Sequence, residues 1–278
     1  MSWFMIPKWF AEIRGQVPSG TSIMLGLVPL VLLVFFWWLA TRGIPEERLL
    51  GPTILPSPAE VAQSFGDLLS ASDKDSQSLL QHIGLSLRRV GLGFLMGLAI
   101  ALPVGILMGS FGSARATMTM VTTASGYIPI ATLVPLTMSW FGLDETQKVA
   151  FLAMAFCIYL LPMVLKSVDS VPDIYLRTAY TLGATRCGII RRVLVPVALP
   201  DIWHSMRLAF GIGWSYLVLA EVVVKSGGLG DMIDTARRRG WSGRVYLVIV
   251  IITVIAWIAD LLWARIGILI FPYRRSRV

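Results

Sequence analysis

The residues of this chain best placed to do chemistry are ionisable side chains that lie within long apolar stretches. Glu221 follows Trp214 and Ser215 in one such stretch, and Asp260 lies in another with Arg265 just over one turn away. A charge in hydrocarbon is unfavourable unless it is paired or hydrated, so each carboxylate needs a partner. We expect Asp260 to pair with Arg265 or with a neighbouring helix. For Glu221 two interpretations stay open, a brace for an outer loop or subunit contact and a gate in a polar pathway.

Side chains arranged for covalent catalysis or metal binding are absent from the sequence. His82 and His204 are far apart, and no HExxH, CxxC or GxSxG element accompanies them. Cys157 and Cys187 lack the spacing of metal ligands, and we expect both to stay reduced. The GxxxxGK loop that cradles nucleotide phosphates is also missing. The sequence therefore predicts no catalytic residue, no metal site and no ATPase site in this chain.

A polar, basic insert separates two of the apolar stretches. Gly183 is positioned to end one short helix, and Thr185 can cap a second one. We expect the second helix to stop near Pro196, because proline lacks a donor and crowds the preceding turn. The two helices form an amphipathic knob whose shape suits docking into a groove of a partner. Its apolar face comprises Leu176, Ala179, Tyr180 and Gly183, and its charge comes from Arg177, Arg186, Arg191 and Arg192.

The composition places the chain in a membrane. Of its 278 residues 56% are hydrophobic and 14% are charged, whereas about a quarter are charged in ordinary soluble proteins. Residues 23–40 form an uninterrupted apolar run, and about 20 such residues cross a bilayer as a helix. In a membrane protein a net charge of +8 indicates basic residues that set the orientation in the bilayer and contact anionic lipids, rather than residues that bind nucleic acid. The fold class is an all-α membrane protein with about six transmembrane helices, the other five at about residues 84–108, 116–138, 147–168, 203–224 and 245–269.

The predicted second span carries a small residue at every fourth position. In lipid such a stripe lets two helix backbones approach closely, because no side chain separates them. We therefore interpret it as a packing surface rather than a ligand site. The stripe consists of Gly93, Gly97, Ala101, Gly105 and Gly109.

The predicted third span is interrupted by Gly126, Pro129 and Pro135. Broken helices persist at membrane depth where they line a cavity or are covered by protein, so this span is either a pathway wall or a simple kink. The candidate pathway or gate residues are Thr122, Thr123 and Ser125 of this span together with Trp214, Ser215 and Glu221.

The remaining segments are polar or basic. Residues 1–22 read as an interfacial amphipathic segment, residues 23–272 as the membrane domain with its core at about 82–269, and residues 273–278 as a basic tail. Residues 41–82 form a long connection with a short helix near 59–69. Lys and Arg divide almost evenly between the two sides, so charge does not decide the orientation.

The cluster Arg237, Arg238 and Arg239 is a docking surface for an acidic partner, an anion funnel or a solvated charge run partly neutralised by Asp231 and Asp234.

Several of these segments resemble the permease subunits of binding-protein-dependent ABC importers. The insert has the spacing of their EAA loop, in which a Glu-Ala-Ala triad precedes a glycine and a Leu-Pro follows. Counted from Gly183, the triad positions hold Arg177, Thr178 and Ala179, so the first two depart from the pattern, and the distal positions hold Val195 and Pro196. Other segments are similar to the sulfonate, taurine and nitrate branch of that family, namely LPSP at 55–58, SLRRV at 86–90, WFG at 140–142, LGA at 182–184 and AE at 220–221.

The resemblance implies a type I importer permease of a bacterial cytoplasmic (inner) membrane, with both termini cytoplasmic. It implies a second, identical permease chain, two ATP-binding cassette subunits that bind ATP and Mg, and an extracytoplasmic substrate-binding protein, with no cofactor in this chain. Arg237, Arg238 and Arg239 are then candidate contacts for the binding protein. Residues 169–200 become the cytoplasmic loop that couples to the ATPase, through Leu176, Arg177, Thr178, Ala179, Tyr180, Gly183, Ala184, Arg186, Arg191, Arg192 and Pro196.

The substrate implied by the resemblance is a small anion such as a sulfonate, taurine, nitrate or bicarbonate. Relatives that move thiamine-precursor pyrimidines share the same signatures, so a non-anionic substrate is the first alternative. A six-helix secondary transporter or channel without an ATPase is the second, although it predicts internal repeats and a relay of buried ionisable groups that are not evident. A membrane-embedded enzyme would need a reactive cluster, and none is found.

Overall fold

The computed structural model describes residues 17–44, 48, 50–70 and 78–273, and these residues form helices joined by turns. The predicted interfacial segment lies mostly outside the described residues, because it covers residues 1–22 and the description begins at residue 17. The predicted basic tail, residues 273–278, lies outside them except for its first residue. Cys157 is partly buried, whereas Cys187 is exposed.

Five helical runs in the described part of the chain are long and apolar enough to cross a membrane. They are α2 (Ser19–Ala40), α4 (Leu79–Ser110), α7 (Glu145–Asp169), the run that ends in α10 (Val195–Val223), and α12 (Ser242–Ile270). A sixth is a pair, α5 (Gly112–Gly126) and the turn η1 (Ile130–Thr132) with α6 (Leu133–Phe141), bent by 86°. The prediction of about six spans, with a break in the third, is confirmed.

The start of α4 was predicted five residues too late. The helix begins at Leu79 because Ser78 and Gln81 form a capping box, in which each side chain accepts a hydrogen bond from the other residue's backbone N–H. Gln81 and His82 interrupt the apolar pattern after Leu79 and Leu80, so hydropathy alone places the span later. The short helix predicted near residues 59–69 is present as α3 (Pro58–Ser70).

The small-residue stripe of α4 packs against α7, as expected. A Cβ atom at Gly93 would lie 2.5 Å from Leu152 Cβ, and one at Gly97 would lie 2.7 Å from Phe156 Cβ. Both distances are shorter than van der Waals contact, so only glycine permits this backbone approach. The seam continues into a buried core where Phe94 meets the rings of Phe156 and Phe210 edge-on.

The second helix of the basic insert does not stop near Pro196. Helix α9 (Arg186–Ile189), a π-helical turn (Ile190–Leu194) and α10 form one helical run over Arg186–Val223. In a regular α-helix the ring of Pro196 would crowd the carbonyl four residues earlier, but a π turn is wider and leaves room for it. The insert is therefore joined to a membrane span without a break.

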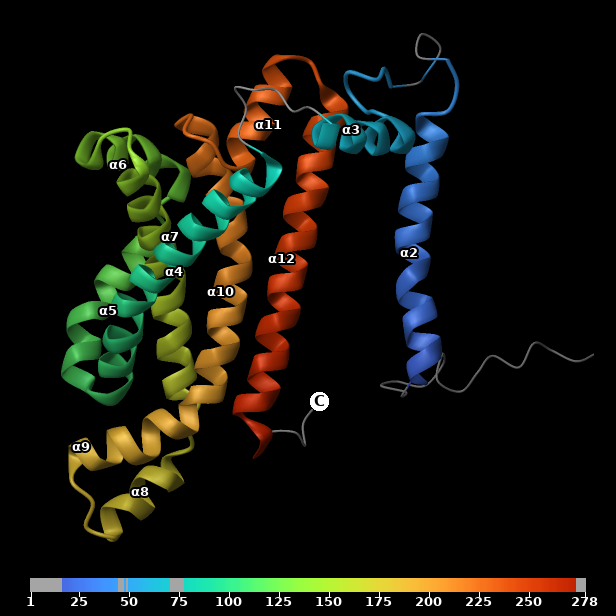
Figure 1. The fold of residues 1–278 in the computed structure, drawn as a ribbon. Helices are drawn as coiled ribbons and strands as arrows, with labels where there is room; N and C mark the ends of the chain where they lie inside the picture. The colour runs from blue at the N-terminus through green and yellow to red at the C-terminus, as the bar shows by residue number, and fades with distance from the viewer. Residues whose placement is uncertain (1–16, 45–47, 49, 71–77, 274–278) are drawn as a thin grey trace, which may run out of the picture.

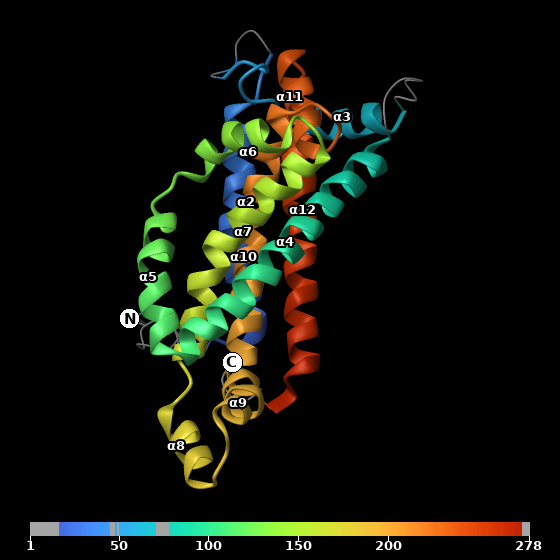
Figure 2. The same ribbon diagram turned by 90° about the vertical axis from the view of Figure 1, so that its left-hand side faces the viewer.

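The helices divide between two ends of the bundle (Figures 1 and 2). Helices α3 and α11 (Leu229–Arg238) lie at one end, while α8 (Asp173–Thr181) and α9 project from the other, where α2 begins and α12 ends. Helix α2 stands apart from α12 in Figure 1, and none of its apolar 18-residue window is buried. It is attached near the α3 end, where the Trp37 indole donates to the Pro56 carbonyl at 2.8 Å and stacks on Tyr246.

Candidate functional site

The turn between α8 and α9 has the geometry predicted for it. Gly183 has a φ of +79°, which glycine adopts without strain. The N–H of Ala184 donates to the Ala179 carbonyl and the N–H of Gly183 to the Tyr180 carbonyl, both at 3.0 Å, which is a Schellman cap. Thr185 caps α9 by accepting from the Gly188 N–H at 3.2 Å. The hairpin is thus a rigid unit formed by local sequence.

The apolar face of α8 divides into two parts. Ala179 is buried, and Leu176 packs against a cluster that includes Leu194 and Ile202, so these two side chains hold α8 to its own chain. Ala179 is therefore largely covered within its own chain, whereas Leu176 is only partly covered. Tyr180 is exposed, as are three apolar neighbours absent from the prediction. These neighbours are Ile174, Tyr175 and, at 81% exposure, Leu182.

The polar residues predicted for the same loop lie on the hairpin surface. Arg177 is 80% exposed and its nearest carboxylate, on Asp173, is 4.0 Å away, so this pair contributes little to stability. The other exposed members of the predicted set are Thr178, Gly183, Ala184, Arg186, Arg191, Arg192 and Pro196. The end of the bundle therefore presents arginines around a small apolar tip.

At the opposite end, α4, α7 and α10 are joined by a largely buried polar group, here called the outer ionic cluster. It comprises the charged residues Arg89, Glu145, Lys148 and Glu221, with the Ser226 hydroxyl bridging Lys148 and Glu145. The side chain of Arg89 is 1% exposed and that of Glu221 is not exposed at all. Arg89 donates from Nη1 to Glu221 at 2.6 Å, and from Nε and Nη2 to Glu145 at 2.8 and 2.5 Å. The buried charges Arg89, Lys148 and Glu221 share this site with Glu145, whose side chain is 52% exposed, and the pairing offsets the cost of burying the other three.

The outer ionic cluster also holds the loop between α10 and α11. Arg89 Nη1 donates to the Gly227 carbonyl at 2.6 Å, and Glu221 accepts from the Gly230 N–H at 2.8 Å and from Ser86 Oγ. At Gly228, φ is +109° and a Cβ atom would lie 2.3 Å from Glu221 Oε1. This geometry favours the brace over the gate among the two interpretations of Glu221.

Sequence reasoning noted Glu221 but missed its partners. Arg89 lies in the SLRRV segment, where the sequence gives two adjacent arginines and no sign of which one is buried. In the structure Arg89 is buried and Arg88 is exposed. Lys148 is fully buried near the start of α7, inside a predicted span. A charge within an apolar stretch is the signal that could have identified it.

The candidate pathway residues do not form one surface in a single chain. Trp214 is 4% exposed and packs against Phe210, whereas Ser215 is exposed on another face of α10. Thr122, Thr123 and Ser125 lie on α5, which is described throughout and has no buried residue. Helix α5 packs on α4 and α7, so the structure places this group apart from Trp214 and Glu221.

The second carboxylate within a span is paired with a neighbouring helix. Asp260 accepts from Arg207 Nε at 2.5 Å and from Arg207 Nη2 at 2.6 Å, which joins α12 to α10. Of the two partners expected for Asp260, the structure therefore selects the neighbouring helix rather than Arg265. A bidentate pair of this kind fixes the two side chains relative to each other.

The three arginines at positions 237–239 fall into two groups. Arg237 and Arg238 donate to Asp234 at 2.8 and 2.7 Å, and these hydrogen bonds hold the pKa of Asp234 at about 2. Arg239 instead lies over the ring of Trp241 at 4.8 Å from its centroid. The expected partial neutralisation is thus confirmed for Asp234 and two of the three arginines, whereas Asp231 accepts from the Gly227 N–H at 3.0 Å.

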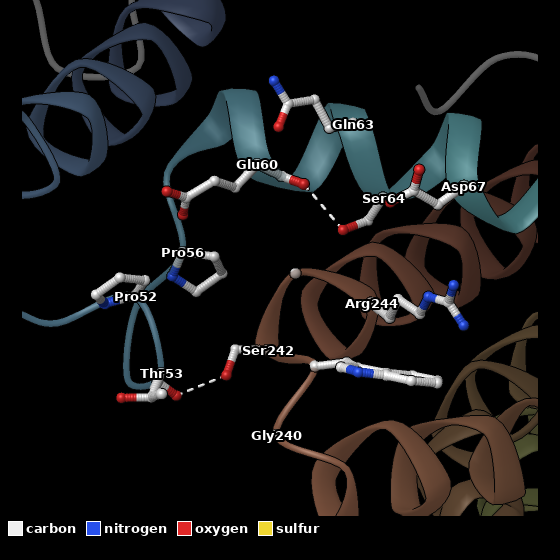
Figure 3. A pocket seen from close by; sticks show the side chains of 12 residues that line it. Pro52, Thr53, Pro56, Glu60, Gln63, Ser64, Asp67, Gly240, Ser242 and Arg244 are labelled. Atoms are coloured by element: carbon white, nitrogen blue, oxygen red, sulfur yellow. Dashed lines mark hydrogen bonds between the residues drawn. The ribbon is translucent and has the colours of Figure 1, made fainter. Parts of the chain in front are cut away.

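A polar pocket of about 390 Å³ lies beside this cluster, between α3 and the start of α12 (Figure 3). Ser242 Oγ donates to the Thr53 carbonyl at 2.6 Å across its floor. Burial alone would raise the pKa of Glu60, but hydrogen bonds from the Ser57 N–H and from Arg48 outweigh it and the pKa is lowered. The carboxylate is therefore ionised at neutral pH and fixes the start of α3.

A bundle of candidate membrane spans with a capped helical hairpin projecting from one end is the architecture that this chain presents for comparison with known proteins. The chain belongs to the family of binding-protein-dependent transport system inner membrane components, whose sequence model matches residues 101–269. It is the multi-pass inner-membrane permease of an ABC importer, without an ATPase site of its own. ATPase subunits and a binding protein complete such an importer.

The relatives agree with this assignment. The chain is 30% identical over 250 residues to the taurine transport system permease protein TauC of Escherichia coli (strain K12), covering 90% of each. It is 28% identical over 259 residues to the putative aliphatic sulfonates transport permease protein SsuC of Bacillus subtilis (strain 168), covering 92% of this chain and 90% of that one. It is 32% identical over 216 residues to the riboflavin transport system permease protein RibX of Chloroflexus aurantiacus (strain ATCC 29366 / DSM 635 / J-10-fl), covering 77% and 76%.

Solved structures share the fold at lower identity. An inward-facing conformation of the MetNI methionine ABC transporter matches with a TM-score of 0.61 and 20% identity, over 68% of this chain and 94% of that chain. A bacterial ABC transporter that imports the acidic polysaccharide alginate matches with a TM-score of 0.56 and 17% identity, over 93% and 94%. The type I importer fold expected from the sequence is confirmed.

Proposed function

We propose that this permease imports a small sulfonate, with taurine as the first candidate. The observation that carries the proposal is its 30% identity to a taurine permease over 90% of both chains. The likeness to a second permease named for aliphatic sulfonates points to the same substrate class. In this proposal the pore is formed by two identical copies, and the α8–α9 end, with both termini, lies in the cytoplasm.

The coupling element is the α8–α9 hairpin, which docks on the ATPase through Tyr175, Tyr180 and Leu182. Support comes from the exposure of these side chains on a doubly capped turn. Large apolar and aromatic side chains at a rigid tip are the type that carries binding energy at interfaces. The arginines around them supply rim contacts to acidic groups of the ATPase.

The helical run that begins at Arg186 transmits the motion of the hairpin. It continues through α10 to the outer ionic cluster, where Glu221 holds the α10–α11 loop. At 1.5 Å per residue its 38 residues have a length of about 57 Å along the helix path, which turns between α9 and α10 (Figure 1). Nucleotide binding favours one state of the ATPase, and a continuous helix with a brace at its far end moves the outer loop together with the hairpin.

The polar face of α5 lines the pathway together with the second copy. Thr123 is exposed at membrane depth, with Thr122 and Ser125 partly exposed beside it. The hydroxyls of Thr122 and Ser125 donate to backbone carbonyls of the same helix, and their oxygens can still accept from water or from a partner chain in the pathway. In this proposal the 86° bend between α5 and α6 forms the narrow part of the pathway.

Uptake by proteoliposomes tests the substrate. The permease is reconstituted with its ATPase and binding protein, and ATP-dependent entry of labelled taurine is measured beside an alkanesulfonate, nitrate and riboflavin. Taurine or alkanesulfonate entry that stops without ATP supports the proposal. The riboflavin relative favours one second candidate, a heteroaromatic substrate. Riboflavin entry without sulfonate entry would establish that candidate and refute the first.

A further inference from the structure

A groove of about 350 Å³ runs between α4 and α7 at the end that carries the outer ionic cluster, beside the end of α6. Its floor is apolar, and its side chains remain largely uncovered: Leu92 is 41% exposed, Met96 51% and Phe141 43%. Val149 and Ala150 of α7 complete the wall. An uncovered apolar groove in a membrane-spanning bundle is filled either by lipid or by another chain.

One net positive charge marks the outer end of this groove. Arg89 and Glu145 line it too, but they are paired with each other at 2.5 Å and belong to the outer ionic cluster. Arg88 is exposed, and among the residues that the structure describes it has neither an ion pair nor a side-chain hydrogen bond. Its five guanidinium donors are therefore free for a ligand.

The groove changes from charged to apolar along α4. Arg88, Leu92 and Met96 follow one another at four-residue intervals, so they lie on one stripe of the helix that is about 12 Å long. Arg88 is at its outer end and Met96 is two turns deeper. This order matches a phospholipid, whose phosphate lies at the membrane surface and whose acyl chains extend inward.

We propose that this groove binds one anionic phospholipid of the phosphatidylglycerol type. Arg88 holds the phosphate, for which the planar guanidinium is well shaped, and an acyl chain lies along Leu92 and Met96. The net charge of the groove favours a headgroup of charge −1 over a zwitterionic one. A free anion such as the transported solute would contact Arg88 alone and leave the apolar floor uncovered, so the observations favour a lipid.

The site goes beyond the proposed transport function and is independent of the substrate. Placing the lipid in the outer leaflet rests on the orientation proposed above, whereas binding itself does not. A lipid seated here contacts both α4 and α7 beside the Arg89–Glu145 pair. It would thus hold together two helices that the outer ionic cluster also joins.

Native mass spectrometry of the intact importer complex tests the proposal. The complex is purified in mild detergent, supplied with phosphatidylglycerol, phosphatidylethanolamine or phosphatidylcholine, and the lipid retained per permease is measured. We expect preferential retention of phosphatidylglycerol, reduced on the order of tenfold by Arg88→Gln, the effect of losing a charge-assisted hydrogen bond. Ala150→Leu should also reduce retention by filling the groove without a change of charge. Arg239→Gln, an exposed arginine at the same end of the bundle, is the matched control and should retain lipid normally.

Three results would overturn the proposal. Arg88→Gln could retain phosphatidylglycerol as the wild type does, or the wild type could retain all three lipids equally. As the third result, the variant Met96→Cys could cross-link to a second permease copy in the native membrane, which would make the groove a subunit interface. Arg88 and Ala150 make no buried polar contact, so both variants should fold, and unchanged thermal unfolding of each complex verifies this. Uptake assays are not needed, so failure here leaves the transport proposal untouched.

Discussion

Replacing Glu221 by Gln separates the brace from the gate. The substitution keeps the shape of the side chain but removes its charge and turns one acceptor oxygen into a donor. Arg89 Nη1, at 2.6 Å, and the Gly230 N–H, at 2.8 Å, then face a neutral amide in a buried position. Glu145 remains as a partner of Arg89, but one of the two buried cations loses its counter-charge.

The expected loss is large for a single substitution. Breaking a buried ion pair by removing one partner destabilises a protein by about 3–5 kcal/mol. The lower end applies here, because Glu145 still binds Arg89. A loss of about 3 kcal/mol corresponds to a fall in unfolding temperature of roughly 6–12 °C for a chain of this size. Thermal unfolding of the purified permease in detergent measures it.

A control and a contrary outcome complete the experiment. Asp173→Asn breaks the exposed pair with Arg177 and should change the unfolding temperature little, since such pairs contribute about 0–1 kcal/mol. Arg89→Gln should destabilise about as strongly as Glu221→Gln, and the double variant should lose much less than the sum, because both belong to one pair. If Glu221→Gln unfolds at the wild-type temperature but abolishes uptake, the brace is refuted and the gate interpretation stands.

Three further predictions concern other parts of the fold. Gly97→Val should destabilise the permease by more than about 1 kcal/mol, because its Cβ would lie 2.7 Å from Phe156 Cβ, whereas Gly91→Val, with open space around it, should have little effect on thermal unfolding. Leu182→Asp should abolish substrate-stimulated ATP hydrolysis by the complex without changing permease stability, since the side chain is 81% exposed; normal stimulation would contradict the docking face. The pKa of Asp234 is lowered from 3.8 to about 2, so its stabilisation should be complete above about pH 4 and disappear as the pH falls through about 2; Asp234→Asn should remove that part of the acid dependence measured by thermal unfolding.

The sequence alone determined the parts of this protein that depend on local pattern. The spans follow from hydrophobic runs, and the close packing of α4 on α7 follows from a small residue at every fourth position. The turn at Gly183 and the cap at Thr185 were also predictable, because both depend on residues within one turn of the chain. The family resemblance rested on segments of the same short range.

Only the tertiary structure decided which distant groups meet. Arg89 and Glu221 are separated by 132 residues, and no local pattern indicates that α4 and α10 bring them to 2.6 Å. The π turn before Pro196 likewise lets a helix continue where proline usually ends one. Which face of α8 stays free depended on the packing of Leu176 against residues of the following run. In each case the outcome depends on which surfaces pack together, a competition among all helices at once that periodicity within one helix does not encode.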